Sequence, residues 1–218
     1  QLVERFSDVA HEIIVVDDSS PDGTADAARA LAVRFPQVRV LLRAEKTGIG
    51  SALRHGYQHA RGEVILSSDT DLSFRVDDLR RLYDTIRSGC DLAIGSRHTV
   101  RSGYETPNWK IRAKYLASRW GNALLKRVFR VPVHDFSANC RAIRRSTWLG
   151  LDTRERTNFF LFEMIFLAQA RGARITEVPV VFLDRKFGQS KINHVVEIPK
   201  AFLKMLAFIF RRRMRRRD

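Results

Sequence analysis

The 218-residue sequence has only two cysteines, Cys90 and Cys140, and neither belongs to a Cys-x-x-Cys pair or has a histidine at metal-ligand spacing. We therefore expect two reduced thiols in the core of a cytosolic protein. No signal peptide opens the chain, and no apolar run approaches the roughly 20 residues that span a bilayer. The P-loop, Gly-x-Ser-x-Gly and His-Glu-x-x-His patterns are absent, which removes the common signatures of NTPases, hydrolases and zinc proteases.

Charge is distributed unevenly along a chain whose net charge is +15. Residues 1–96 contain 12 Lys and Arg against 15 Asp and Glu, whereas residues 97–218 contain 27 against 9. The basic half could face nucleic acid, an anionic membrane or a polyanionic substrate, and composition does not choose among them. The length suits one sizeable α/β domain.

Apolar runs alternate with amphipathic segments in the pattern of a parallel sheet wound with helices. A segment at 175–183 also reads as a strand, with Pro179 marking an edge or a bulge. The predicted strands are 12–16, 38–42, 64–67, 91–94 and 175–183, and the predicted helices are 2–10, 25–35, 50–60, one starting near Arg75, 109–129 and 159–170.

Carboxylates follow two of these strands: Asp17 and Asp18 the first, Asp69 and Asp71 the third. Ligands of open α/β sheets bind beyond the carboxyl ends of the strands. Asp69 and Asp71 could share Mg²⁺ or Mn²⁺, or Asp71 or Ser73 could cap the next helix. Four acids at one sheet edge would repel each other without a cation or hydrogen-bond donors, which favours the metal.

Basic side chains occupy complementary places in the second half. Arg97 leaves the strand 91–94, where it could hold an oxyanion. Lys114, Ser118 and Asn122 share one face of the helix 109–129, and this face either binds phosphate or is simply solvated. Arg185 and Lys191 flank a glycine turn and could close over a diphosphate.

Two further features have alternative interpretations. Gly48-Ile49-Gly50 resembles part of a dinucleotide loop, but Leu53 stands where the third glycine is required, so we favour a turn into the helix. Glu163, the one acid of the apolar helix 159–170, is either paired structurally or held near the site.

The C-terminal segment, residues 193–218, has a helical apolar stripe followed by Arg211–Arg217. Ten apolar residues from Ala201 to Phe210 rise only about 15 Å as a helix, too short to cross a bilayer. We expect an amphipathic interfacial helix with a polybasic tail on an anionic membrane surface. A core helix with a basic tail and a truncated membrane anchor are the alternatives.

Five motifs together resemble the polyprenyl-phosphate glycosyltransferases of glycosyltransferase family 2, such as dolichyl-phosphate mannosyltransferase. The resemblance spans residues 12–192 and implies a GT-A (Rossmann-like) catalytic domain, mostly parallel sheet flanked by helices. The motifs are Val16–Thr24, Lys46–Gly50, Asp69–Ser73, Gly95–Arg97 and Glu177–Arg185 followed by Gly188–Lys191.

The resemblance also implies roles for individual residues. Nucleotide-sugar binding falls to Val16, Asp18, Asp69, Thr70, Asp71, Arg97, Arg185 and Lys191. Asp69, Asp71 and Ser73 would bind Mg²⁺ or Mn²⁺, and Arg97, Lys114 and Ser118 would bind the acceptor phosphate. Asp71, Arg97 and Arg185 would be catalytic.

Three departures from the family pattern stand out. Lys114 replaces a frequent Arg and cannot form a bidentate fork. The segment Asp135-Phe-Ser-Ala-Asn139 lacks the usual glycine. The family's first strand and its nucleotide loop have no counterpart, so the resemblance implies that the catalytic domain, residues 1–192, is incomplete at its N-terminus.

The resemblance implies inverting, metal-dependent transfer of a sugar to a polyprenyl or dolichyl phosphate at the cytoplasmic face of a membrane, where the protein is peripheral. Mannose from GDP-mannose is the expected donor group. Transfer of glucose or another hexose from a UDP-sugar to undecaprenyl phosphate is the first alternative. A basic nucleic-acid-binding module is the second, but its aromatic residues are not interleaved with the basic ones and the acidic strand ends would repel phosphate, so no nucleic-acid partner is expected.

Overall fold

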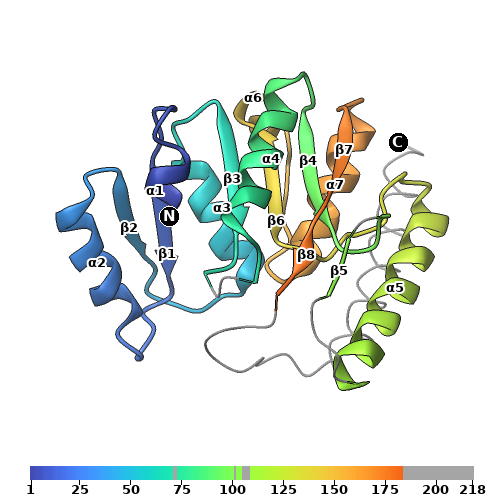
Figure 1. Cartoon of the computed structure of the whole chain (residues 1–218), viewed down its shortest axis with the longest axis horizontal. Coiled ribbons are helices and arrows are strands. Elements are labelled where there is room, and N and C mark those ends of the chain that lie inside the picture. Colours follow the sequence, from blue (N-terminus) through green and yellow to red (C-terminus); the bar gives the residue numbers. More distant parts are fainter. Residues whose placement is uncertain (71–72, 101, 105–108, 184–218) are drawn as a thin grey trace. The chain divides into compact units, whose positions relative to one another are not determined.

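A computed structural model describes residues 1–70, 73–100, 102–104 and 109–183 of the chain (Figure 1). The described helices are α1 (Leu2–Arg5), α2 (Thr24–Arg34), α3 (Ile49–His59), α4 (Val76–Arg87), α5 (Trp109–Phe129), α6 (Arg145–Leu149) and α7 (Phe159–Ala170). The described strands are β1 (Ile13–Asp17), β2 (Val38–Leu42), β3 (Val64–Ser68), β4 (Leu92–Ser96), β5 (Gly103–Tyr104), β6 (Cys140–Arg144), β7 (Ile175–Pro179) and β8 (Val181–Phe182). The expected helix and tail at 193–218 lie outside this part of the chain.

The described strands form three sheets. A four-stranded sheet has the order β3-β6-β4-β7, and β1-β2 and β5-β8 are two-stranded parallel sheets. The pairs β1-β2, β4-β7 and β5-β8 are parallel, as expected, but β6 runs antiparallel between β3 and β4. Strand β6 was not predicted, because the two arginines in its sequence Cys-Arg-Ala-Ile-Arg mask the apolar alternation.

Strand β6 carries a charged residue, Arg141, in the middle of the sheet. Arg141 is fully buried, and its guanidinium donates to the backbone carbonyls of Phe136, Ala138 and Leu161. Burial lowers the pKa of Arg141 to about 10. The three carbonyls replace the hydration that burial removes, so the side chain ties β6 to α7.

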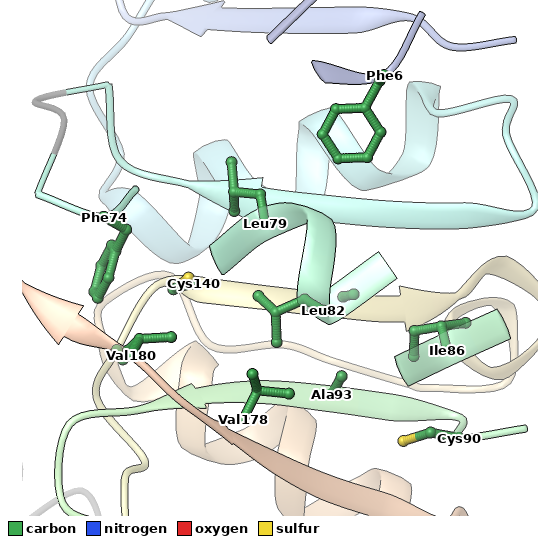
Figure 2. Close-up of a cluster of buried hydrophobic side chains, with 12 residues drawn as sticks. Phe6, Phe74, Leu79, Leu82, Ile86, Cys90, Ala93, Cys140, Val178 and Val180 are labelled. Atoms are coloured by element: carbon green, nitrogen blue, oxygen red, sulfur yellow. The ribbon is translucent and has the colours of Figure 1, made fainter. Parts of the chain in front are cut away.

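One core cluster lies between α4 and the four-stranded sheet (Figure 2). Leu79, Leu82 and Ile86 recur at helical spacing on α4 and face Ala93 of β4 and Val178 of β7. Side chains alternate between the two faces of a strand, so Cys140 and Ala142 join this cluster while Arg141 reaches toward α7. Both cysteines are free and buried, as predicted.

Most predicted elements agree with the structure, and three details need correction. The predicted helix 2–10 ends at Arg5, after which Phe6 turns onto Tyr83 of α4 with the two rings 5.9 Å apart. The apolar run 12–16 is typical of a fully buried strand, but only Asp17 of β1 is buried, since β1 pairs with β2 alone among the described strands. The segment 175–183 divides at Val180 into β7 and β8, and β7 lies at the edge of the described four-stranded sheet, as the edge alternative for Pro179 predicted.

The strands β3 and β4 run in the same direction, because each is antiparallel to β6. Figure 1 shows their carboxyl ends, together with that of β1, along one edge of the molecule's first unit, residues 1–186. The side chains that leave this edge belong to the loops after β1, β3 and β4. We therefore look for the predicted site residues along this edge of the unit.

Candidate active site

At the end of β3, a chain of polar side chains leads from the core to Asp69. The Tyr57 hydroxyl lies 2.7 Å from Ser67 Oγ, which in turn donates to Asn139 Oδ1 at 2.9 Å. Asn139 Nδ2 donates to Asp69 Oδ1 at 2.8 Å. Tyr57 and Asn139 are buried, so the Asp69 carboxylate is oriented by groups whose own positions are fixed by packing.

The acids after β1 have partners of a different kind. Asp17 is buried, and its Oδ1 accepts the backbone N–H of Ser20 at 2.9 Å. Asp18 lies 3.2 Å from Arg43 Nε, and both side chains are mostly buried. A backbone N–H donor to Asp17 and an ion pair to Asp18 thus offset the repulsion expected at this edge, so these two acids need no cation for that purpose.

At the end of β4, Arg97 forms a two-pronged ion pair with Asp135. Arg97 Nε lies 2.7 Å from Asp135 Oδ2, and Nη2 lies 2.9 Å from Oδ1. Arg97 Nη2 also donates to Ser137 Oγ at 2.7 Å. Burial alone would raise the pKa of Asp135, but Arg97 and the backbone N–H donors outweigh it and hold that pKa well below its usual range.

The loop at 134–135 is fixed from below by Glu177 of β7. Its carboxylate accepts the backbone N–H of His134 at 2.9 Å and that of Asp135 at 3.1 Å. The same carboxylate contacts His134 Nδ1 at 2.6 Å, and Lys126 Nζ lies 2.6 Å from His134 Nε2. Glu177 of β7, together with Lys126 of α5 acting through His134, therefore fixes the position of Asp135 and, through it, that of Arg97.

Helix α5 joins the site through Ser118 and Asn122. His98 Nε2 lies 3.3 Å from Ser118 Oγ, and Asn122 Nδ2 donates to the same hydroxyl at 3.3 Å. Asn122 Oδ1 accepts the Phe136 backbone N–H at 3.0 Å. The shared helix face predicted for Ser118 and Asn122 is present, and it faces the loop that holds Arg97.

The five-residue segment 135–139 connects the two halves of the site. Its first residue, Asp135, binds Arg97 after β4, and its last residue, Asn139, binds Asp69 after β3. A carboxylate group suited to a cation and a guanidinium suited to a phosphate are thereby held by one short stretch of backbone.

Several predicted site residues are placed separately from these contacts or lie outside the described part. Val16 is half-buried on β1, next to Gly56 of α3, and Thr70 is exposed in the turn after Asp69. Asp71, Arg185 and Lys191, together with the side chain of Lys114, lie outside the described residues. Within the described residues, no three His, Cys, Asp or Glu side chains form a metal-binding group.

The helix-capping alternative is wrong for Ser73. The N-cap of α4 is Arg75, whose backbone N–H is bound by Asp78 in a capping box. Ser73 is buried, and its carbonyl accepts the Leu183 N–H at 3.0 Å. Ser73 therefore connects the loop after β3 with the end of β8.

The glycines at the start of α3 allow close packing against the loop before α7. Gly48 has a φ of 107°, and a Cβ there would collide with the Arg156 carbonyl. A Cβ on Gly50 would lie 2.5 Å from the Phe160 side chain. Glu163 orders the same loop by accepting hydrogen bonds from the backbone N–H groups of Arg154 and Glu155, both at 2.9 Å. The glycines thus support the predicted turn into the helix, and Glu163 has the structural pairing that was one of its two predicted roles.

Sequence reasoning missed the residues that position the site: Asp135, Asn139, His98 and Glu177. The available signal was the segment 135–139 itself, which places an acid, a hydroxyl and an amide between predicted elements. The sequence prediction considered only the glycine that this segment lacks. Asp135 and Asn139 are buried, and buried polar side chains require hydrogen-bond partners.

Residues 2–148 match the family model described as glycosyl transferase family 2. The chain is 36% identical over 189 residues to undecaprenyl-phosphate mannosyltransferase of Micrococcus luteus, covering 84% of this chain and 76% of the relative. It is 35% identical to polyprenol monophosphomannose synthase of Mycolicibacterium smegmatis, covering 83% and 70%. Against dolichol-phosphate mannosyltransferase of Pyrococcus furiosus it is 30% identical, covering 84% of this chain and 51% of the relative.

Solved structures of the same fold include glucosyl-3-phosphoglycerate synthase of Mycobacterium tuberculosis. In its complex with Mn²⁺, UDP and phosphoglyceric acid, it superposes with a TM-score of 0.64 at 18% identity, covering 97% of this chain and 72% of the other. Its complex with Mn²⁺, UDP-glucose and phosphoglyceric acid gives a TM-score of 0.59 at 18% identity, covering 87% and 66%. This similarity supports the GT-A fold expected from the sequence.

Proposed function

The chain belongs to glycosyltransferase family 2, and we propose that it transfers mannose from a nucleotide sugar, GDP-mannose, to a polyprenyl phosphate. The three relatives described above are named for mannosyl transfer to such lipids or for synthesis of the product. The observation that carries the proposal is the segment 135–139, which holds Asp69 at the carboxyl end of β3 and Arg97 at the carboxyl end of β4. Asp69 would serve the cation on the donor diphosphate, and Arg97 would serve the phosphate of the acceptor.

The donor is proposed to lie over the ends of β1 and β3. Val16 and Asp18 would contact the nucleotide base, and Asp69, Thr70 and Asp71 would hold the diphosphate and its cation. Arg97, Arg185 and Lys191 would contact phosphate oxygens, with Asp71, Arg97 and Arg185 as the catalytic residues. The acceptor phosphate would bind between Arg97, Lys114 and Ser118.

A hard divalent cation, Mg²⁺ or Mn²⁺, fits the chemistry of the residues after β3. Carboxylate oxygens are the ligands such ions prefer, and the Asn139 amide already orients Asp69. Asp69, Asp71 and Ser73 are the residues proposed to hold it. When bound, the cation would neutralise charge on the leaving nucleotide diphosphate.

The remaining chemistry follows from the charge of the acceptor. A phosphate monoester is ionised at neutral pH, so it needs no general base to act as a nucleophile. The obstacle is repulsion between two phosphate-bearing substrates, which preorganised cationic groups offset. Arg97 is suited to this task because Asp135 fixes its orientation before substrate binds. We propose a single displacement with inversion at the anomeric carbon.

The proposed catalytic domain, residues 1–192, would be completed by one additional strand. In the described residues β1-β2 and the sheet that starts with β3 are separate, and a strand between β1 and β3 would join them. Together with the proposed interfacial segment 193–218, this domain would work as a peripheral protein at the cytoplasmic face of an anionic membrane. No described helix is both long and apolar enough to cross a bilayer.

Donor specificity is tested with a panel of GDP-mannose, UDP-glucose and related donors, each with polyprenyl phosphate and Mn²⁺ or Mg²⁺. The assay uses the chain itself and a form extended upstream of Gln1 by a strand. We expect mannosyl transfer from GDP-mannose with the extended form. Turnover only with a UDP-sugar would replace the donor assignment with the glucosyl alternative, and no turnover with any donor would refute the proposal.

The metal assignment is tested by Asp71→Asn. We expect this substitution to abolish metal-dependent transfer, because it removes one carboxylate charge from the proposed cation site. Asp26→Asn, an exposed acid on α2, is the matched control and should retain activity. Full activity of Asp71→Asn would exclude the metal role.

A further inference from the structure

Two histidines lie about one helical turn apart near the end of α3. His55 and His59 are four residues apart, so their side chains leave the same face of the helix. Their ring centroids lie 4.3 Å apart, with 49° between the ring planes. His59 is exposed and His55 is half-buried, whereas Tyr57, between them in sequence, is buried against Trp148 of α6. The pair therefore lies on the side of α3 that solvent can reach.

The backbone fixes which nitrogen of His59 can bind a ligand. Its Nδ1 lies 2.8 Å from the carbonyl oxygen of His55. A carbonyl oxygen only accepts hydrogen bonds, so this nitrogen carries the proton, and in the neutral ring the lone pair is on Nε2. Metal-binding histidines donate their second ring N–H to a carbonyl in the same way, which fixes the tautomer and the orientation of the ring.

The charges around the pair permit a bound cation. Partial burial, with smaller effects of the charges of His59 and Arg43, lowers the pKa of His55, so its ring is neutral at pH 7. The Arg43 guanidinium would repel a cation, but Asp18 lies 3.2 Å from its Nε and offsets that charge. Helix α3 ends at His59, and the partial negative charge at a helix C-terminus favours a cation in the last turn.

The donor atoms of the pair indicate the class of metal. Imidazole nitrogen suits Zn²⁺, Ni²⁺ and Cu²⁺, whereas Mg²⁺ and Mn²⁺ prefer carboxylate oxygen. Two imidazoles on one ion, each with a nitrogen about 2.0–2.1 Å from it, have ring centroids about 4.5–5.5 Å apart, and the observed separation of 4.3 Å is close to that range. Within the described residues no third His, Cys, Asp or Glu joins the pair, so water would fill the remaining coordination positions.

The spacing of the pair is also that of the two histidines in the His-Glu-x-x-His pattern, where both bind zinc and the glutamate is the general base. In the segment His55-Gly-Tyr-Gln-His59, Gly56 stands in the place of that glutamate. The pair can therefore hold an ion, but it supplies no base that would activate a bound water for hydrolysis.

We propose that His55 and His59 form a surface site for a divalent transition metal of the Zn²⁺, Ni²⁺ and Cu²⁺ class, separate from the carboxylate site proposed at Asp69. By joining two successive turns, the ion would stabilise the C-terminal half of α3. That half carries Tyr57, the first member of the polar chain that orients Asp69. The proposal is independent of the transfer reaction, because neither histidine is placed in the donor or the acceptor site.

The test is calorimetry of the untagged full chain with Zn²⁺ in the presence of excess Mg²⁺, which occupies carboxylate sites but competes poorly for imidazole. His55→Gln and His59→Gln should each weaken Zn²⁺ binding at least about tenfold, because the second imidazole binds at a high effective concentration once the first is bound. Gln58→Ala removes an exposed side chain beside the pair and should bind Zn²⁺ like the parent chain.

A variant with the same number of histidines tests the spacing itself. His55→Gln/Gln58→His keeps all six histidines of the chain but places two of them at the adjacent positions 58 and 59, where side chains of a helix do not face each other. It should bind Zn²⁺ as weakly as His55→Gln. Zn²⁺ should also raise the unfolding temperature of the parent chain, since it binds the folded state, and should raise that of the variant less.

Three results would overturn the proposal. The first is absence of Zn²⁺ binding by the parent chain. The second is parent-like affinity in His55→Gln/His59→Gln, which would place the bound metal elsewhere, and the third is parent-like affinity in His55→Gln/Gln58→His, which would make the spacing irrelevant. Without metal, all variants should unfold at the temperature of the parent chain, so that a lost affinity reports on the site and not on the fold. The donor panel tests the proposed function separately.

Discussion

Replacing Asp135 with asparagine removes the negative charge that holds Arg97. Asp135 Oδ2 accepts hydrogen bonds from the backbone N–H and the Nε of Arg97, and Oδ1 accepts them from Arg97 Nη2, the Ser137 hydroxyl and the backbone N–H groups of Ser137 and Ala138. An asparagine amide must point its NH₂ group at one of these sets. The variant therefore loses an ion pair and also places a donor against donors.

The expected loss follows from burial. The Asp135 side chain is 0% exposed and that of Arg97 is 12% exposed, so solvent cannot replace the missing partner. Breaking a buried pair by removing one member costs about 3–5 kcal/mol. Because the folded state of a typical domain is stable by only about 5–15 kcal/mol, we expect a large fall in the denaturation midpoint at pH 7.

The same pair has a defined pH dependence. The pKa of Asp135 in the folded state lies below the unfolded value of about 3.9. The contribution of the pair to the unfolding free energy is therefore complete above that value and is lost as pH falls through the folded-state pKa. The difference in unfolding free energy between the parent chain and Asp135→Asn should therefore shrink below about pH 4.

Urea denaturation followed by circular dichroism at pH 7 and at pH 3 measures both effects. The control is Asp26→Asn, whose exposed pair with Arg29 on α2 should contribute less than about 0.5 kcal/mol. A loss in Asp135→Asn no larger than that of the control would refute the role assigned to Asp135. So would a difference that stays constant from pH 7 to pH 3.

Three other substitutions have distinct expected outcomes. Asn139→Ala removes the amide that orients Asp69 and should weaken Mn²⁺ binding about 10–100-fold in calorimetry, as loss of a residue supporting a ligand does; unchanged affinity would count against the site. Ser118→Ala should raise the KM for the polyprenyl acceptor and leave the KM for the donor unchanged, and a change in the donor KM alone would contradict the acceptor assignment. Gly48→Ala forces a Cβ onto the Arg156 carbonyl at a φ of 107° and should destabilise the fold by about 1–3 kcal/mol in thermal unfolding, whereas Gly121→Ala, which meets nothing within 4 Å, should not.

Long periodic segments were predicted well from the sequence. The bounds of α5 and α7 agree with the predicted helices, because each segment has about three or more turns of consistent pattern. The strand ends that position Asp69 and Arg97 were also predicted, since short apolar runs end there at residues with a clear change of polarity.

Features that depend on distant partners were not predicted. A strand with Arg141 at its centre is acceptable only because three carbonyls from other segments receive its guanidinium. The roles of Asp135 and Asn139 arise from contacts across 38 and 70 residues of sequence, and local patterns contain no information on such pairs.

The segment 135–139 also limits how the spacing of the site can change. Four peptide units span at most about 14 Å when fully extended, so the residues that hold the proposed cation carboxylate and the proposed phosphate-binding arginine can never be farther apart than that. A deletion within 136–138 would draw both groups together, and an insertion would release both. Donor and acceptor geometry in this chain would therefore have to evolve together, through changes in the length of one loop.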